Sequence, residues 1–428
     1  MVTAMHSLFS FTRWPWYVFI LFVISNVFIG PIRWLFAQAG LVPFIYLPIV
    51  LVGIGFVGHI AAHFYLGKTS RHQICALFLI PLGILSGLLH VADPKQVAFG
   101  FYALWPFFFG ICFGPFLLRK LVNFERGALL IWLCASGGVI FNALGSYPWE
   151  GFEYPVGGIN VESSREWYSG DSSKRLAGFS RASFDAAIQI ALTCCPAIAL
   201  TNRLTVKIAI AALSIAAIFF TNAKGMLLSF VLMILLSMLN DQWLVRLKVP
   251  LFSSLLALGM CLPLVSWLIQ YRFDITGIAA NTTIYSFTDR IENMWPEALE
   301  LLTHHGSLII GRGFGGIGVA QSYFEPQLFN AADNVFVYCS VVGGLGMFPV
   351  AAAVLIKFMT RIDPDIRVER AGYLMMVLVL VYGLTANVFE NAPMALALGI
   401  LISWGLDESA FSKVRPSHNT ALQSKVTL

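Results

Sequence analysis

Long apolar stretches separated by short polar segments dominate the chain. A helix that crosses the hydrocarbon core of a bilayer needs about 20 mainly apolar residues. Twelve stretches come near this length: Trp14–Gly30, Val42–Leu66, Ile74–Val91, Val97–Leu118, Ala128–Leu144, Phe184–Leu200, Val206–Phe220, Gly225–Leu239, Val249–Ile269, Val335–Phe358, Tyr373–Val388 and Met394–Leu406. The pattern predicts an all-α polytopic membrane protein with about 12 transmembrane helices, forming one integral membrane domain over residues 1–428.

Two longer polar segments, at about 145–183 and 270–333, are the loop insertions of this domain. Loops of such length are uncommon and usually functional. The second contains a helical stripe of apolar residues: Ile291, Met294, Trp295, Ala298, Leu299 and Leu302. We expect an amphipathic helix that lies along the membrane surface or packs on the bundle. Asp289 and Glu292 resemble a capping box at its start, and Pro296 should kink it.

The composition supports a membrane protein and excludes several other classes. Hydrophobic residues make up 58% of the chain and charged residues only 11%, whereas an ordinary globular chain carries roughly 25% charged residues. So few charges cannot cover a water-facing surface of this size. The composition excludes a soluble enzyme, a nucleic-acid-binding domain and a disordered chain.

The distribution of charge predicts the orientation in the membrane. If the N-terminus is cytoplasmic, the inner segments hold 17 of the 27 Lys and Arg residues and 7 of the 22 acidic residues. This is the positive-inside pattern, and it places both termini in the cytoplasm. The first apolar run lacks a cleavage site of small residues, so we interpret it as a retained anchor. No cluster of metal ligands occurs, and we expect neither a metal nor a cofactor.

Five cations in the outer segments are candidates for binding an anionic substrate: Arg175, Arg181, Lys224, Arg272 and Arg290. Arginine forks bind phosphate oxygens in a two-pronged way, so they suit a diphosphate. The alternative is that these side chains anchor the protein to lipid headgroups. A cation at the start of a helix is opposed by the helix dipole, and this favours a ligand for Arg290.

Two further pairs of residues could exchange protons. His304 and His305 end the amphipathic stripe, where histidine is also favoured for structural reasons alone. Asp333 and Asn334 stand directly before an apolar span. Asp333 could simply cap that helix, or it could accept a proton from an attacking hydroxyl group.

A glycine-rich segment, Gly311–Gly318, contains a formal GxGxxG match with Arg312 as its only charge. The dinucleotide fingerprint requires a strand, a turn and a helix, and no such unit is predicted here. The glycines could instead permit close approach of the backbone to a ligand.

Several short motifs resemble those of the O-antigen ligase/polymerase family of bacterial surface polysaccharide assembly. They are Arg175-Leu-Ala-Gly-Phe, Thr221-Asn-Ala-Lys-Gly, Asp289-Arg-Ile-Glu-Asn-Met-Trp, Ile310-Gly-Arg-Gly-Phe-Gly, Asp333-Asn-Val-Phe-Val-Tyr and Gly343-Gly-Leu-Gly. Ligases of this family carry a His-Asn pair where this chain has Asp333-Asn334, so the resemblance favours the polymerase branch. The family turn usually shows arginine where this chain has Lys224, which keeps the charge but loses the fork.

The resemblance implies metal-independent glycosyl transfer at the periplasmic face of the bacterial inner membrane. The substrate would be oligosaccharide linked to undecaprenyl diphosphate, and membrane lipids and other polysaccharide-assembly proteins would be the remaining partners. No nucleic acid is expected as a partner. An O-antigen ligase and a flippase or twelve-span transporter remain alternatives.

The expected roles of the residues follow from this chemistry. Negative charge develops on the leaving diphosphate, so nearby cations stabilise the transition state. We expect Asp333, Arg290 and Lys224 to be catalytic, and Arg175, Arg181, Arg272 and Arg312 to bind the diphosphate. Further candidates are His304, His305 and Asn334. Four aromatic residues could offer flat faces to sugar rings: Trp149, Tyr154, Trp167 and Tyr168.

Overall fold

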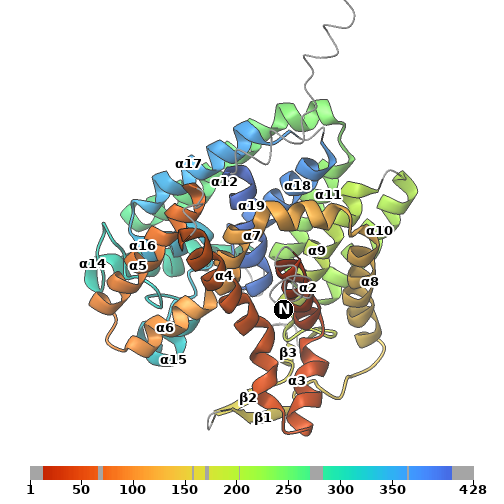
Figure 1. Cartoon of the computed structure of the whole chain (residues 1–428), viewed down its shortest axis with the longest axis horizontal. Coiled ribbons are helices and arrows are strands. Elements are labelled where there is room, and N and C mark those ends of the chain that lie inside the picture. The colour runs from red at the N-terminus through yellow and green to blue at the C-terminus, as the bar shows by residue number, and fades with distance from the viewer. Residues whose placement is uncertain are drawn as a thin grey trace, which may run out of the picture.

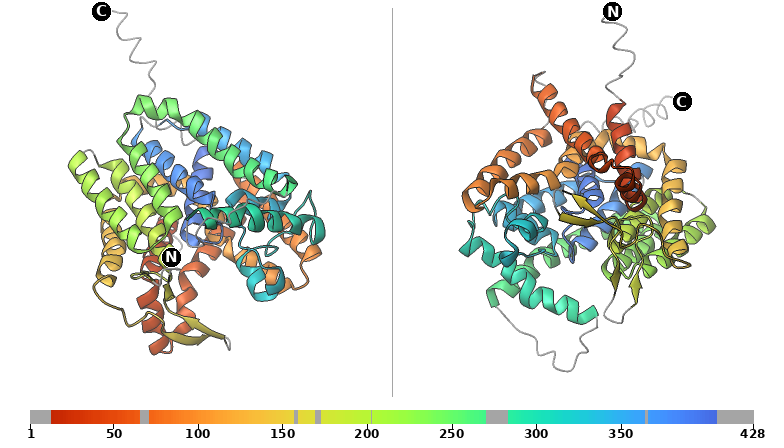
Figure 2. Two further views of the ribbon diagram at one scale, coloured as in Figure 1. Left: turned by 180° about the vertical axis from the view of Figure 1, so that it is seen from behind. Right: turned by 90° about the horizontal axis from the view of Figure 1, so that it is seen from below.

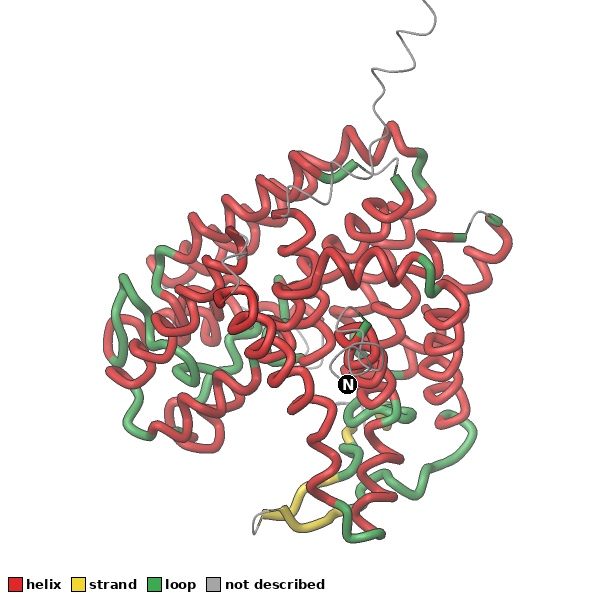
Figure 3. Tube along the Cα trace, viewed as in Figure 1, coloured by secondary structure: helices red, strands yellow, loops and turns green. Residues whose placement is uncertain are grey.

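The structure is a computed structural model, and it describes residues 13–65, 71–156, 159–168, 173–201, 203–269, 283–363 and 366–406. Arg272 lies outside the described residues. Helices make up most of the chain, and the few strands are short (Figure 3). The predicted helical class is therefore confirmed.

The first third of the chain is helical. Its elements are α2 (Trp14–Val27), α3 (Ile29–Gln38), the 3-10 helix η1 (Val42–Tyr46), α4 (Leu47–Tyr65), α5 (Arg71–His90), α6 (Pro94–Ala103), α7 (Trp105–Val122) and α8 (Glu125–Asn142). The apolar run from Trp14 is not one straight span, because α2 and α3 are bent by 84° at Phe28. α3 consequently leaves the bundle and lies beside the strands (Figure 1).

The first polar segment forms two small antiparallel hairpins. Strands β1 (Glu153–Val156) and β2 (Ile159–Glu162) pair with Tyr154 opposite Val161, and β3 (Trp167–Tyr168) and β4 (Lys174–Arg175) pair with Trp167 opposite Arg175. Lys174 bridges Glu150 and Glu166 at 2.8 Å each and ties the second hairpin to the start of the segment.

The remaining helices follow in chain order. They are α9 (Ser183–Leu200), α10 (Leu204–Phe220), α11 (Lys224–Met238), α12 (Asp241–Ile269), α13 (Thr283–Asp289), the π turn η2 (Arg290–Met294), α14 (Trp295–His304), α15 (Val319–Phe324), the 3-10 turn η3 (Pro326–Leu328), α16 (Val335–Gly343), α17 (Met347–Arg361), α18 (Arg367–Gly383) and α19 (Ala392–Leu406). Figure 2 shows these helices from two further sides, and α19 packs against α7, α9, α17 and α18.

Several helices are able to cross a membrane. By length and composition, three described helices qualify, Val42–Tyr65, Pro94–Leu121 and Asp241–Ile269, and the bent pair α2 and α3 adds a fourth if it counts as one span. Five shorter apolar helices accompany them. This is fewer than the twelve predicted spans, since several apolar stretches form helices shorter than a bilayer requires.

One predicted span is wrong as a single helix. The stretch Val335–Phe358 is divided into α16 and α17 at Gly344, whose φ angle is 82°. A left-handed residue ends an α-helix, and glycine adopts that conformation without steric cost. The motif Gly343-Gly-Leu-Gly is thus the end of one helix and the turn into the next.

The predicted amphipathic helix forms, and it packs on the bundle. α14 contacts α12 and α16, and its apolar stripe is buried at Trp295, Ala298, Leu299 and Leu302. The predicted capping box is wrong, because the helix already begins at Thr283 and Asp289 accepts a bond from Asn293 at 2.7 Å. The kink expected at Pro296 is replaced by a π turn just before it. Proline has no backbone N–H, so it cannot donate to the carbonyl one helical turn earlier.

Segments that the charge pattern assigns to the same side of the membrane contact one another. On the predicted inner side, Arg370 bonds to Asp241 and to the carbonyls of Ser237 and Leu239. On the predicted outer side, Gly30 donates to the carbonyl of Phe179 at 2.9 Å. This contact joins α3 to the described segment that holds Arg175 and Arg181.

Candidate functional site

An ion pair between Arg290 and Asp333 is the centre of the candidate site. The Arg290 Nη2 donates to Asp333 Oδ2 at 2.7 Å, and the two side chains are 20% and 25% exposed. Arg290 also donates to the carbonyl and the hydroxyl of Ser286, at 2.8 and 2.6 Å. Its Nε is buried and has no hydrogen-bond partner within the described part of the chain. The pair joins the π turn to the segment before α16, 43 residues later in the chain.

The backbone is unusual at the same place. Asn222, Ala332 and Asp333 have φ angles of 53°, 64° and 37°, and they are the non-glycine residues of the described chain with positive φ. Such conformations cost roughly 1–3 kcal/mol each and cluster at functional sites. The π turn that carries Arg290 is another feature frequent at functional sites.

Burial and Arg290 act on Asp333 in opposite directions. Burial raises the pKa of the Asp333 carboxyl above its ordinary value, and the Arg290 charge and hydrogen bond oppose this rise. The carbonyl of Asp333 accepts a bond from the Trp295 indole at 3.4 Å. Asp333 is thus a carboxylate held in a fixed place at the edge of the bundle.

Asn334, and not Asp333, caps α16. The Asn334 Oδ1 accepts bonds from the backbone N–H groups of Phe336 and Val337, at 2.8 and 3.2 Å. Its Nδ2 donates to the carbonyls of Gly259 and Leu384. Since the side chain is fully buried and has these partners, Asn334 has a structural role, and the interpretation of Asp333 as a helix cap is wrong.

The Thr221–Gly225 turn and Arg175 form a second part of the site. Arg175 donates to the carbonyls of Thr221 and Asn222, at 3.4 Å each. Burial lowers the pKa of Arg175. Lys224 is the first residue of α11 and is exposed, with no ion pair to a carboxylate in the described part of the chain.

Tyr382 of α18 is close to both parts of the site. Its side chain is within electrostatic range of Arg175, Arg290 and Asp333. Gly225, which follows Lys224, packs against the ring: a Cβ atom there would lie 3.9 Å from two ring carbons. The structure thereby brings the predicted residues Arg175, Arg290 and Asp333 near one tyrosine, together with the backbone of the turn that holds Lys224. The sequence pattern did not identify this tyrosine.

Arg181 does not join this group. Its charge lies near Arg33 and Asp185, and its carbonyl accepts a bond from the backbone of Arg165 at 2.7 Å. Asp185 is within electrostatic range of both Arg181 and Tyr382, so this second cluster adjoins the first.

Arg312 is buried inside the protein, away from any open surface. The side chain is 1% exposed and pairs with Glu325 at 3.1 Å, and it also donates to the carbonyls of His305 and Gly316. The glycines around it approach other parts of the protein: Gly313 packs on Gly87 of α5. The expectations of a diphosphate ligand for Arg312 and of close backbone approach to a ligand are therefore not supported here, because this segment and its charge are already fully partnered.

His304 and His305 are exposed at the far end of α14. With a rise of about 1.5 Å per residue, His304 lies roughly 13 Å along the helix from Trp295. Neither histidine meets Asp333 or Arg290 in the described structure.

The four predicted aromatic residues have different roles. Trp149 donates to the carbonyl of Gly178 at 3.0 Å and stacks on Tyr147, so it supports the loop. Tyr154 is buried, and Tyr168 is exposed and bonds to Glu166. Trp167 lies between two guanidinium groups, with Arg165 and Arg175 at 5.7 and 5.6 Å from its ring centre.

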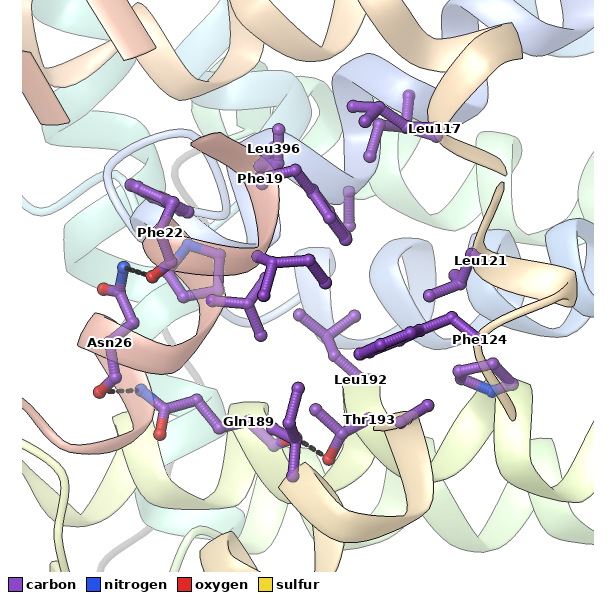
Figure 4. A pocket seen from close by; sticks show the side chains of 18 of the residues that line it. Phe19, Phe22, Asn26, Leu117, Leu121, Phe124, Gln189, Leu192, Thr193 and Leu396 are labelled. Carbon is purple, nitrogen blue, oxygen red and sulfur yellow. Dashed lines mark hydrogen bonds between the residues drawn. The ribbon is translucent and has the colours of Figure 1, made fainter. Parts of the chain in front are cut away.

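An apolar pocket lies within the bundle, between α2, α7, α8, α9 and α19 (Figure 4). Phe19, Leu117 and Leu192 are among its lining residues. At one end, Gln189 donates to the carbonyl of Asn26 at 2.8 Å. The lining suits a hydrocarbon chain and offers few groups to a sugar.

No family model, no curated protein and no solved structure matched the chain.

Proposed function

We propose that this protein is a polysaccharide polymerase that joins oligosaccharide repeat units carried on undecaprenyl diphosphate. In this proposal it spans the inner membrane of a bacterium about twelve times and acts at the periplasmic face. The observation that carries the proposal is the Arg290–Asp333 ion pair, which has Tyr382 as a common neighbour with Arg175 and the Lys224 turn. It offers one carboxylate among several cations, as a lipid diphosphate donor requires.

The reaction needs one base and a stabilised leaving group. The hydroxyl oxygen of the acceptor saccharide attacks the anomeric carbon of the donor, and Asp333 takes the hydroxyl proton. The bond from the anomeric carbon to the diphosphate oxygen breaks, and its electron pair leaves with the diphosphate. Arg175, Lys224 and Arg290 stabilise the charge that develops there, and each charged hydrogen bond contributes about 1.5–3 kcal/mol.

Arg290 connects substrate binding with activation of the base. In the structure it is partnered by Asp333. A diphosphate carries more charge than one carboxylate, so it would draw the Arg290 fork toward itself. Asp333 would then keep its buried position but lose the charge that lowers its pKa, and it would become a stronger base.

Reconstitution with a defined substrate tests the proposal. Purified protein in liposomes is supplied with an undecaprenyl-diphosphate oligosaccharide, and both chain length and released undecaprenyl diphosphate are measured. We expect long chains and one released carrier per bond formed. Asp333→Asn should lower the rate by roughly 10²–10⁴, the range for loss of a general base.

Asp289→Asn is the matched control, because Asp289 lies near the same site but bonds to Asn293 on its own helix. We expect it to keep the rate within about twofold. Full polymer synthesis by Asp333→Asn or by Arg290→Ala, in stably inserted protein, would refute the assignment. Transfer of finished polymer to lipid A core without chain growth would indicate a ligase, and translocation of repeat units without bond formation would indicate a flippase.

A further inference from the structure

The second cluster consists of Arg33, Arg165, Arg181 and Asp185, and it carries more positive than negative charge. Arg33, Arg165 and Arg181 are all within electrostatic range of Asp185. Asp185 supplies one negative charge, and its Oδ1 also accepts a bond from Asn391 at 2.8 Å. Arg33 and Arg181 lie close enough to repel each other. Such an arrangement is unfavourable unless an anion completes it.

Three donors in this cluster are buried and have no hydrogen-bond partner among the residues that the structure describes: Arg33 Nε, Arg181 Nε and the Tyr154 hydroxyl. Arg33 and Tyr154 are only 8% and 3% exposed. The Arg33 Nη1 makes one long bond, 3.3 Å, to the carbonyl of Glu162. Buried donors normally find partners, and here three different elements supply unpartnered donors within electrostatic range of one another.

We propose that this cluster is a second oxyanion site, and that it binds the carboxylate of an acidic sugar within the saccharide chain. The inference rests on the proposed polymerase function and names a class of substrate for it: a repeat unit that bears a uronic acid. Arg33, Arg181 and Tyr154 donate to the carboxylate, and Arg165 contributes charge.

The position of the cluster favours a saccharide. Arg33 is on α3 and Tyr154 is on β1, and these elements project from the helical bundle at its lower edge (Figure 1). Tyr46 and Tyr102 lie in the same electrostatic neighbourhood and are half-buried. Phenol rings offer both an apolar face and a hydroxyl group, which suits a sugar ring.

An anionic lipid is the competing occupant. The apolar pocket reaches Gln189, whose Oε1 accepts a bond from Ser180 at 2.7 Å, and Ser180 precedes Arg181. A hydrocarbon chain in that pocket could bring a phosphate toward the cluster. The experiment therefore needs one probe for each source of the oxyanion.

The test compares three probes on the full chain in nanodiscs of zwitterionic lipid. Methyl glucuronide and methyl glucoside differ only in the carboxylate, and decyl phosphate carries a phosphate on an alkyl chain. Calorimetric titration should show methyl glucuronide binding at least tenfold more tightly than methyl glucoside.

Two variants locate the binding. Arg33→Gln removes the buried charge, and Tyr154→Phe removes only the unpartnered hydroxyl and keeps the buried ring. We expect both to lower glucuronide affinity, by more than tenfold and by severalfold respectively. Arg246→Gln is the control with unchanged affinity, because Arg246 is an exposed residue of α12 that stacks on Trp243.

The outcomes separate this inference from the proposed function. Equal binding of glucuronide and glucoside, or unchanged glucuronide affinity in Tyr154→Phe, overturns the acidic-sugar site. Binding of decyl phosphate alone, lost in Arg33→Gln, overturns it in favour of a lipid headgroup. Undecaprenyl diphosphate affinity should fall in Lys224→Gln and persist in Arg33→Gln. If Lys224→Gln leaves that affinity unchanged, the diphosphate clamp fails while the glucuronide result still stands by itself.

Discussion

At the scale of single residues, the candidate site depends on side chains that a strained backbone holds in place. Asp333 has a φ angle of 37°, and the preceding residue, Ala332, has one of 64° and is fully buried. A regular strand or helix at this point would turn the carboxylate away from Arg290. The strain is maintained by the cap at Asn334 and by the bond from Trp295.

The pH dependence of turnover should report the state of Asp333. As a base it acts only when deprotonated, so activity falls as the pH drops through its pKa. Burial raises that pKa, so the loss should begin above the ordinary aspartate value of about 3.9. Arg290→Gln removes the charge that lowers the pKa, and the acidic limb of its residual activity should move to higher pH.

Rate against pH in proteoliposomes measures this shift. Lys224→Gln serves as the comparison, because it lowers the rate without touching the Asp333 carboxyl. An acidic limb that stays in place in Arg290→Gln would mean that Asp333 is not the titrating group.

Part of the site was predictable from the sequence. Arg175, Lys224, Arg290 and Asp333 stand out because a charge is rare in such an apolar chain. Tyr382 could not be found in this way, since it lies inside an apolar run and gains its place only when α18 packs beside α11.

At the scale of elements, the local backbone conformation decides where helices bend and end. The apolar pattern located the helices, but it did not show the bend between α2 and α3 or the break at Gly344. The hydrophobic pattern indicates which segments are buried in protein or lipid, but it does not determine the φ angles within a segment. The Gly343-Gly pair was the available signal for the break.

Arg312 should prove to be a stabilising residue. Arg312→Gln leaves Glu325 without its charged partner and removes bonds to two carbonyls. Breaking a buried pair in this way costs about 3–5 kcal/mol. We expect a clearly lower melting temperature in detergent and unchanged undecaprenyl diphosphate affinity for the folded fraction.

Arg361→Gln is a suitable control, since Arg361 is half-buried at the other end of the bundle. The melting temperature of Arg361→Gln should fall less than that of Arg312→Gln. A folded Arg312→Gln protein with normal stability and weakened diphosphate binding would return Arg312 to the substrate site.

Glu390 should make stability depend on pH. Its carboxylate accepts two contacts from the backbone N–H of Val319, at 2.8 and 2.9 Å, and ties α15 to the loop before α19. Burial raises its pKa to about 8, against the hydrogen bonds from Val319 and Asn387. In the unfolded chain, the glutamate carboxyl loses its proton near pH 4.3. Between about pH 4.3 and about pH 8, the folded protein therefore holds a proton on Glu390 that the unfolded chain has released. The free energy of unfolding falls as the pH rises through this range and is constant above it.

Melting temperatures from pH 5 to pH 9 check this slope. Glu390→Gln should flatten it, whereas Glu153→Gln, at an exposed position on β1, should not. An equal slope in Glu390→Gln and in the unaltered protein would contradict the assignment.

At the scale of the whole molecule, the charge pattern makes a test of orientation possible. Glu153 and Arg246 are both exposed and lie in segments assigned to opposite sides of the membrane. A cysteine placed at Glu153 should react with an impermeant maleimide in intact cells. One placed at Arg246 should react only after the cells are permeabilised, and the unaltered chain gives the background from its native cysteines. The reverse result would invert the proposed topology.

Trp167 affects how binding at the proposed diphosphate site and binding at the proposed acidic-sugar site influence each other. One indole ring contacts both Arg165 and Arg175, so a ligand that withdraws either guanidinium group changes the environment of the other. Binding at the two proposed sites would then be thermodynamically linked, and each ligand would alter the affinity of the other by the same factor. The saccharide and the lipid diphosphate would report on each other through a single side chain.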